Sequence, residues 1–263
     1  MSRPQALCGY CGKPGRTREH HWGKWSKKYL PRLHPSHTHT IRRVEPLTGE
    51  ETFLNGSLTG PGDMRSRAIK VPCRSCNMTW MKAIGERAEP ILARLQAGDW
   101  WDLSADERTA LAAWSTMFTM TYEFADLGTQ ITPPEERLYL MQNSCPPPNW
   151  KVWVAEIQVG TVWHAGVTHH KALYAGPASE VKTGNIQTTT FTFGKLLIHT
   201  FSTTAKLDFK TTEYGNRLGL QSLWPISSSR IVQPTRPHTN GEAEVVAQIL
   251  GEALAYFFGG AAL

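Results

Sequence analysis

The sequence predicts an α+β protein, with a basic, cysteine-bearing part over residues 1–100 and a helix-plus-antiparallel-sheet part over residues 101–263. Three observations predict this fold class. Two Cys-x-x-Cys pairs lie in the first part, two helix-capping patterns precede amphipathic stretches, and segments that alternate apolar and polar residues follow a proline run. With 40% hydrophobic and 19% charged residues, the chain has the composition of a folded globular protein.

Positive charge is concentrated in the first part. Residues 1–100 contain 17 lysines and arginines against 8 acidic residues, a net charge of +9, whereas residues 101–263 contain 11 against 14, a net charge of −3. Basic side chains interleaved with tryptophan are typical of nucleic-acid-binding surfaces, because they displace counterions from phosphates. A solvated basic surface without such a partner is the alternative. The candidate DNA-contacting residues are Lys24, Lys27, Lys28, Arg42 and Arg43.

No apolar run approaches the roughly 18 residues that a membrane-spanning helix needs. The first residues also lack the apolar core of a secretory signal. We therefore expect a cytoplasmic protein without a membrane partner. Residues 101–263 could mediate homo-oligomerisation or bind a protein partner, and their sequence predicts no specific role.

The spacing of the cysteines predicts a structural zinc site. Cys8 and Cys11 form one Cys-x-x-Cys pair, and Cys73 and Cys76 form a second one. Two such pairs supply the four thiolates of a closed tetrahedral Zn²⁺ site. A redox-active pair is the rival interpretation, but it leaves the other pair unexplained. The fifth cysteine, Cys145, is expected to be an unliganded thiol.

A zinc ion held by all four cysteines would draw two further segments together. Glu19, His20 and His21 follow the first pair, and Asn77 directly follows the second one. A carboxylate and an imidazole beside an asparagine could hold a divalent cation and activate water, as metal-assisted phosphodiester hydrolysis requires. A histidine that merely packs on the surface or in the core remains the alternative for His20.

The sequence segments that contain the two cysteine pairs, Glu19-His20 and Asn77 resemble the HNH endonuclease superfamily, in its phage and bacterial branch with E-H-x-x-P-K-W and C-x-x-C-N-x-x-W-M segments. The resemblance covers about residues 8–92 and implies a zinc-stapled ββα-metal module. It implies His20 as general base, Asn77 as the residue that orients it, Glu19 as a ligand of a catalytic Mg²⁺ or Mn²⁺, and the cysteines as the Zn²⁺ site. In a second assignment, typical of colicin-type members, His20 binds the metal and His21 is the base.

Two positions depart from the family pattern. Gly23 stands where the family has proline, and Gly85 stands where the helix after Asn77 would present an acidic ligand. Glu86 is the nearest replacement, although it lies about 100° further round a regular helix, unless a π-bulge shifts it. His34, His37 and His39 are other possible donors. The expected function is metal-dependent DNA hydrolysis; the alternative is a catalytically degenerate HNH-like protein that binds nucleic acid or a protein.

The remaining elements follow from local patterns. We expect a helix over 87–95, a helix from the Ser104–Glu107 capping box to about residue 126, and a final helix from the Thr239–Glu242 capping box to about residue 258. The expected inward side chains are Leu111, Trp114, Phe118 and Tyr122 in the second helix and Val245, Val246, Ile249 and Leu254 in the last. Thr132-Pro133-Pro134 is expected to be a linker. Half-buried strands are expected over 151–159, 162–168, 188–193 and 196–202, with His169 and His170 at a strand end.

Overall fold

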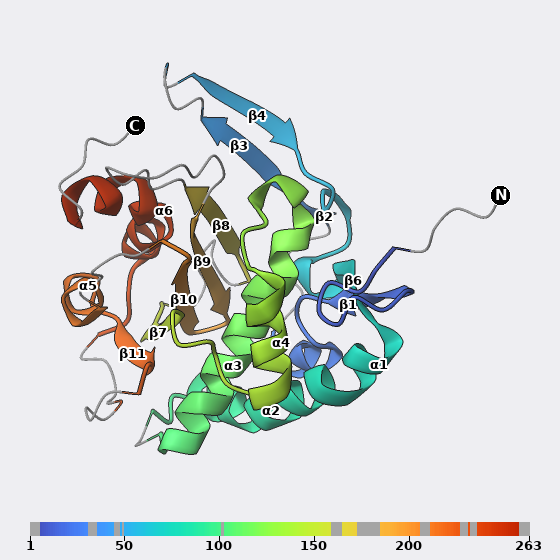
Figure 1. Ribbon diagram of the computed structural model, residues 1–263. Coiled ribbons are helices and arrows are strands. Elements are labelled where there is room, and N and C mark those ends of the chain that lie inside the picture. Colours follow the sequence, from blue (N-terminus) through green and yellow to red (C-terminus); the bar gives the residue numbers. More distant parts are fainter. Residues whose placement is uncertain are drawn as a thin grey trace.

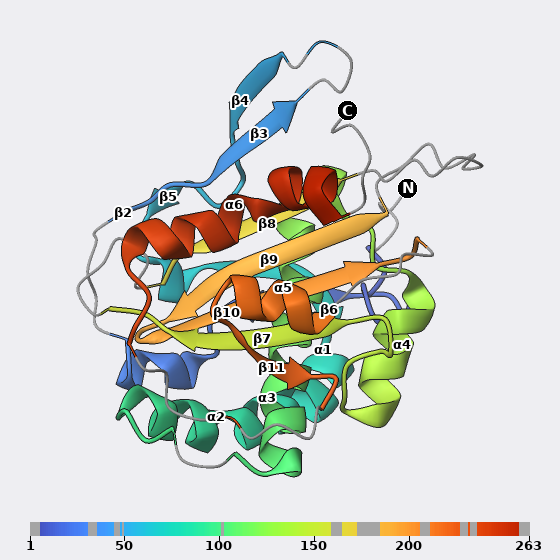
Figure 2. The ribbon, with the colours of Figure 1, turned by 90° about the vertical axis from the view of Figure 1, so that its left-hand side faces the viewer.

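A five-stranded antiparallel sheet is the largest β element of the computed structural model (Figure 1, Figure 2). Its order is β11-β7-β10-β9-β8, formed by Gln221–Trp224, Lys151–Glu156, Leu196–Thr203, Ile186–Phe193 and Val167–Ala172. The structure describes residues 6–30, 36–44, 48, 50–100, 103–158, 165–172, 185–205, 211–226, 231 and 236–257. Of the strand expected over 162–168, residues 162–164 lie outside these residues, and β8 begins at Val167 and continues to Ala172.

Helices cover both faces of this sheet. Helix α3 (Ala105–Tyr122) packs on β7, β10 and β11, while α6 (Asn240–Phe257) packs on β8, β9 and β10. Successive side chains of a strand face opposite sides: Val152 and Val154 join the apolar cluster of α3, and Trp153 and Ala155 join that of α6. Figure 2 shows α6 lying along the sheet on the face away from α3.

The expectation of half-buried strands is wrong for β9, in which every side chain is buried. Its alternating threonines do not face solvent, because α6 covers the face on which they lie. One of their hydroxyls bonds to another buried side chain: Thr190 Oγ1 lies 2.7 Å from His199 Nδ1. His169 and His170 likewise lie inside β8 rather than at a strand end.

Both predicted capping boxes are confirmed. Ser104 Oγ accepts from the Glu107 N–H, and Thr239 Oγ1 accepts from the Glu242 N–H, each at 3.2 Å. The four expected inward side chains of α3 are buried, and the helix gives way to a 3₁₀ turn (Glu123–Ala125) after Tyr122.

In the final helix, Val246 is buried, but Val245 is 55% exposed because it lies on the other side of α6. The side chains of Ile249 and Leu254 lie outside the described part of the chain. Of the expected linker, Thr132 and Pro133 lie outside regular secondary structure, while Pro134 is the first residue of a further helix, α4 (Pro134–Asn143). No helix in the described part of the chain combines the length and apolar character that crossing a bilayer requires.

The first part of the chain consists of short strand pairs and helices. Strand β1 (Arg16–His20) pairs with β6 (Ala68–Cys73), which leads through α1 (Arg74–Cys76) and a π-helical turn (Asn77–Met81) into α2 (Lys82–Gln96). Ile91, Leu92 and Leu95 of α2 are buried as expected. Between β1 and β6 come the 3₁₀ helix η1 (Lys24–Lys28), the strand pairs β2 (Ser36–His37) with β5 (Gly60–Pro61) and β3 (Thr40–Val44) with β4 (Glu51–Asn55), and the 3₁₀ turn η2 (Met64–Ser66).

The two parts share one apolar core. Trp22, between β1 and η1, is fully buried, and its ring centroid lies 4.8 Å from that of Phe118 on α3. It also lies 5.8 Å from Phe191 and 5.9 Å from Phe193 of β9. A boundary near residue 100 therefore does not separate two cores, and the cysteine-bearing part rests on the sheet through its aromatic side chains.

Candidate functional site: a four-cysteine centre beside an acidic and aromatic pocket

The four predicted cysteines lie together. Their Sγ atoms are all within 4.8 Å of one another, with 3.9 Å between Cys8 and Cys76 and 3.6 Å between Cys11 and Cys73. A tetrahedron with Zn–S bonds of 2.3 Å has edges of about 3.8 Å. The donor set therefore fits a tetrahedral ion such as zinc. Cys145 is a free, half-buried cysteine outside this cluster, as expected.

Backbone amides surround the sulfurs. Cys8 Sγ accepts from the N–H groups of Cys73 at 3.2 Å and Tyr10 at 3.4 Å. Burial raises the pKa of the Cys8 thiol, but the N–H groups of Cys11, Tyr10 and Cys73 outweigh it and hold that pKa at about 7. Such N–H donors favour the thiolate, which is the form that binds metal.

The centre is also fixed to the rest of the molecule. Tyr10, between the first two cysteines, packs edge-on against Trp80 at 5.0 Å and bonds to Thr121 Oγ1 of α3 at 2.7 Å. Gly9 approaches the ring of Phe124 so closely that a Cβ there would lie 2.6 Å from it. Only glycine fits this close approach, which ties the first cysteine loop to the end of α3.

Strand β1 leads from the cysteine centre to the predicted catalytic residues. Glu19 and His20 are its last two residues, and both are half-buried. The side-chain amide of Asn77 donates weakly to Thr17 Oγ1 and to the Arg18 carbonyl, both at 3.4 Å, and it also hydrogen-bonds to the Glu19 side chain. Asn77 therefore anchors β1 and Glu19, while His20 Nδ1 is buried without a hydrogen-bond partner among the described residues.

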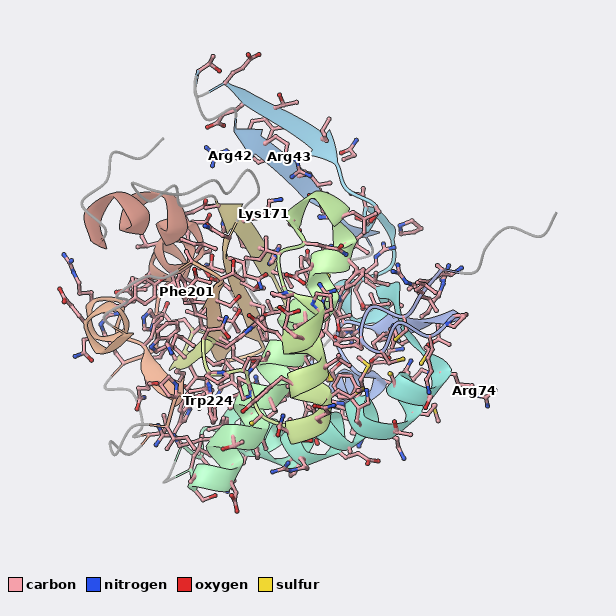
Figure 3. The ribbon with its side chains drawn as sticks, viewed as in Figure 1. Arg42, Arg43, Arg74, Lys171, Phe201 and Trp224 are labelled. Atoms are coloured by element: carbon pink, nitrogen blue, oxygen red, sulfur yellow. The ribbon has the colours of Figure 1, made fainter. Side chains whose placement is uncertain are left out.

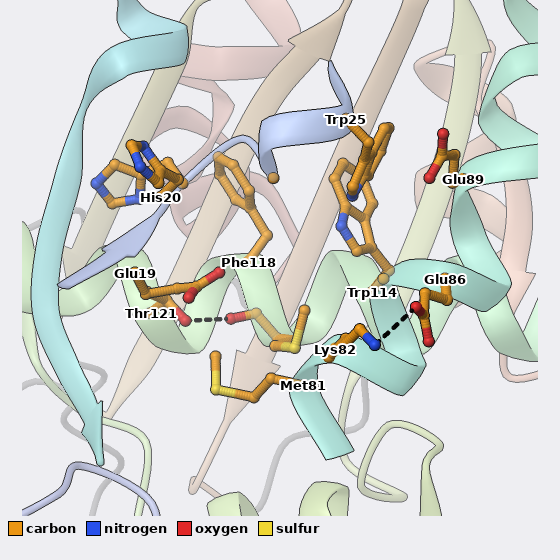
Figure 4. Close-up of a pocket in the computed structure, with 14 residues that line it drawn as sticks. Glu19, His20, Trp25, Met81, Lys82, Glu86, Glu89, Trp114, Phe118 and Thr121 are labelled. Carbon is orange, nitrogen blue, oxygen red and sulfur yellow. Dashed lines mark hydrogen bonds and ion pairs between the residues drawn. The ribbon is translucent and has the colours of Figure 1, made fainter. Parts of the chain in front are cut away.

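A pocket of about 250 Å³ lies where β1, η1, α2 and α3 meet. One wall carries Glu19 and His20, the opposite wall carries residues of α2, and the floor is formed by α3 (Figure 4). Its aromatic and thioether residues are Trp25, Met81, Trp114, Met117 and Phe118; its polar ones are Glu19, His20, His21, Lys82, Glu86, Glu89 and Thr121, with Gly23 and Gly85 between them.

Burial governs the ionisation of the first wall. It raises the pKa of Glu19 to about 7, a shift that the Asn77 amide and Lys24 partly oppose. Burial, followed by the positive charges of Lys24 and Lys27, lowers the pKa of His20. Near neutral pH, the Glu19 carboxyl and the His20 imidazole are therefore each charged in a smaller fraction of molecules than the same groups in a free side chain.

His21 differs from its neighbour. It is 5% exposed, its ring lies 4.9 Å from that of Tyr122, and neither ring nitrogen has a hydrogen-bond partner among the described residues. The other candidate donors do not line the pocket: His39 is buried with Nδ1 accepting from the Leu58 N–H at 3.3 Å, and His37 lies in β2. His34 lies outside the described residues.

The α2 wall contains Gly85 and Glu86, the two positions at which a third ligand of the catalytic metal was expected. Gly85 is buried and Glu86 is exposed, yet both line the pocket. A π-helical turn precedes them, and because such a turn holds an extra residue, later residues lag behind those of a regular α helix. Glu86 therefore faces the pocket rim rather than pointing away. Its carboxylate is 3.2 Å from Lys82 Nζ.

The expected donors of a catalytic cation do not form a compact set here. In the described part of the chain, the four cysteines are the one group of three or more histidine, cysteine or acidic side chains with all ligand atoms within 4.8 Å of one another. Glu19, His20 and Glu86 offer oxygen and nitrogen donors that suit Mg²⁺ or Mn²⁺, but on opposite walls of the pocket. Their spacing in this structure does not make a closed coordination sphere.

The basic candidates divide into two groups. Lys24, Lys27 and Lys28 belong to the exposed side of η1 beside the pocket, where Lys28 Nζ is 2.8 Å from Glu89. Arg42 and Arg43 lie on the projecting β3–β4 hairpin (Figure 3), where they pair with Glu51 and Asp126. The two arginines and Lys28 are thus each paired with a carboxylate, whereas the positive charges of Lys24 and Lys27 act on His20.

Several residues that line the pocket were not predicted from the sequence to belong to a functional site. Trp114 and Phe118 were expected to be core residues, and they are buried, but one side of each also borders the pocket. Trp25 and Met81 belong to the segments that resemble the HNH superfamily, but no role in a pocket was expected for them, and Thr121 carried no functional signal. Their role depends on four segments meeting in space, which periodicity within one segment does not show.

Comparisons with family models, curated proteins and solved structures found no significant match to this chain.

Proposed function

We propose that this protein is a metal-dependent endonuclease of HNH type, which hydrolyses phosphodiester bonds of DNA. The observation that carries the proposal is the placement of Glu19 and His20 on one wall of a pocket, at the end of the strand β1 that leads there from the four-cysteine centre. The antiparallel β1–β6 pair followed by a helix supports it, since this order of elements agrees with the ββα arrangement that the sequence resemblance implies.

In this proposal each residue has a defined task. His20 accepts the proton of the attacking water, and it is better suited than the almost fully buried His21 because it is half-exposed. Asn77 holds the strand that carries His20. Lys24 and Lys27 attract the phosphate. A divalent cation bound through Glu19 supplies charge that stabilises the developing negative charge on the phosphate.

Plasmid nicking is the direct test. Purified protein should convert supercoiled plasmid to the nicked form with added Mg²⁺ or Mn²⁺, and it should do so poorly without an added divalent cation. A chelator is unsuitable for the second condition because it would also remove structural zinc. Absence of nicking with either metal, in protein that contains stoichiometric zinc, contradicts the proposal.

A second function is favoured by one observation. Gly85 occupies the pocket wall without a side chain, and Glu86 is paired with Lys82. A catalytically degenerate protein that binds nucleic acid or a protein through the same surface agrees with these features. Gel-shift experiments beside the nicking assay separate the two functions, because the degenerate protein should shift DNA without cutting it.

A further inference from the structure

The pocket combines two kinds of surface that the hydrolytic function alone does not need. Its rim carries Glu19 and His20, whereas its interior is aromatic and thioether-lined by Trp25, Trp114 and Phe118 with Met81 and Met117 (Figure 4). Its volume of about 250 Å³ is below the range of roughly 300 to 1,000 Å³ that drug-sized ligands occupy. The space suits a single planar ring system.

We infer that the pocket holds one unpaired nucleobase, and that the preferred substrate is therefore single-stranded or locally unpaired DNA. This inference rests on the proposed function and names its substrate class. A base inside a duplex is stacked and paired, so it reaches a side pocket only after leaving the stack. Aromatic rings bind bases of any sequence through their faces, and flexible methionines adapt to their outlines.

Trp25 is the residue that contacts the base. Its indole is half-buried and is held by neighbouring rings, 6.0 Å from Trp114 and 5.5 Å from Phe193 between centroids. It belongs to η1, the same 3₁₀ helix that carries the exposed Lys24 and Lys27. A base against Trp25 would therefore leave its own phosphates beside two lysines and near His20. The charge of η1 complements the backbone that such a base carries.

Gly85 lies beside the edge of the Trp25 indole. A Cβ at this position would meet Trp25 Nε1 at 3.7 Å, which is ordinary van der Waals contact. A Cβ therefore fits, whereas a larger side chain at residue 85 would press on the indole and occupy part of the pocket that both residues line. Glycine inside a helix is less favourable than other residues, so the replacement should not weaken α2.

The test measures binding rather than cleavage. Anisotropy of a fluorescein-labelled 12-nucleotide DNA strand, and of the same strand in a duplex, is measured at low salt with zinc-loaded full-length protein and no added divalent cation. We expect the single strand to bind at least 10-fold more tightly. Trp25→Ala should weaken single-strand binding by about 5- to 100-fold, since that is the usual effect of removing one stacking residue, and Trp25→Phe should restore most of it.

Gly85→Leu is the independent variant, because it blocks the pocket while Trp25 remains. It should weaken single-strand binding about as much as Trp25→Ala and leave duplex binding unchanged. Trp224→Ala is the matched control: this half-buried tryptophan lies on β11, at the edge of the large sheet (Figure 3). It should leave binding unchanged.

Equal affinity for single strand and duplex, no effect of Gly85→Leu, or no binding of either DNA overturns the inference. Nicking activity together with any of these results leaves the proposed nuclease function standing and rejects only the base pocket. Single-strand binding that depends on Trp25 and Gly85, in a protein that cuts nothing, supports the base pocket and rejects hydrolysis.

Discussion

The cysteine centre and the pocket lie at opposite ends of β1, and they differ in how their polar atoms are satisfied. In the cysteine centre, the sulfurs approach one another at tetrahedral spacing and receive backbone N–H donors. At the pocket end, His20 Nδ1 and both ring nitrogens of His21 are buried without partners among the described residues. Folded proteins rarely leave buried polar atoms unpaired. We therefore expect the first region to contribute to stability, and we propose the second as the ligand-binding region.

The largest effect is expected from breaking the cysteine centre. Cys73→Ser should lose the zinc, and because the binding free energy of a structural ion is also folding free energy, the variant should be less stable by about 5 kcal/mol. For a chain of this size that lowers the thermal midpoint by roughly 10 to 20 °C. Elemental analysis and thermal denaturation check it. Cys145→Ser is the control and should match wild type, and a wild-type protein that holds no zinc would refute the site.

The next largest effect concerns the pocket alone. His20→Ala should lower the nicking rate on the order of 10² to 10⁴, the usual contribution of a general base, without changing zinc content or thermal midpoint. Asn77→Ala should cost less because Asn77 contacts β1 rather than the imidazole. If His21→Ala abolishes cleavage and His20→Ala does not, the base is His21 and the second assignment of the histidines is correct.

The α2 wall allows a sharper experiment on the missing ligand. If Glu86 serves as the third metal ligand, Glu86→Gln should reduce metal-dependent nicking by roughly 10-fold or more. If the site is degenerate, wild type should be nearly inert, and Gly85→Glu should create or raise activity, since residue 85 has room for a side chain. A fully active wild type with an equally active Glu86→Gln variant would place the ligand elsewhere.

The charged residues should have smaller effects. Replacing both Lys27 and Lys28 by glutamate should weaken DNA binding about 3- to 10-fold for all DNA sequences. The affinity should also depend less steeply on salt concentration, because the variant neutralises fewer phosphates and its binding releases fewer counterions. Arg42→Gln should change less, since Glu51 already neutralises Arg42. Titrations at several salt concentrations check both. An Arg42 effect equal to that of the lysines would show that the hairpin contacts DNA directly.

The last prediction concerns pH and a histidine that belongs to neither region. Burial lowers the pKa of His199 to about 3, and its ring nitrogens bond to Thr190 and Tyr214. Because the folded pKa lies below the unfolded value of about 6.5, the unfolded chain binds the extra proton, so stability falls as pH drops from about 6.5 to 3. His199 alone should contribute about 1.4 kcal/mol per pH unit to this slope, and His21 and His169, whose pKa values burial also lowers, should add to it.

Urea denaturation at pH 7 and pH 5 measures this slope. His199→Gln removes the titrating group while keeping a polar side chain, so the variant should lose stability less steeply on acidification than wild type. Identical slopes for the two proteins would mean that His199 is protonated in the folded state.

The sequence predicted those features that short segments encode. The Cys-x-x-Cys spacing, the Ser104–Glu107 and Thr239–Glu242 capping boxes and the buried face of α3 are each set by residues a few positions apart, and the structure contains all of them. Helix α4 was missed because Pro133-Pro134 was interpreted as a linker. Proline is in fact well suited to the first position of a helix, where its missing N–H costs no hydrogen bond.

Features that depend on distant residues were not predictable. Arg43 pairs with Asp126, which lies 83 positions away in the sequence, so its availability to DNA could not be judged from local charge. The burial of β9 on both faces depends on α6, which begins far downstream. The pocket is the strongest case, because four separate segments supply its walls.

The shared aromatic core also sets the order in which the chain can mature during synthesis. Zinc can be captured once Cys76 has left the ribosome, after closure of the long loop that begins at Cys11, and loop closure becomes only slowly costlier with length. Trp22, however, packs on Phe191 and Phe193. A nascent chain therefore has all four cysteines available before the strand that supports Trp22 has been made, so we expect the pocket wall that carries His20 to be completed only with the central sheet.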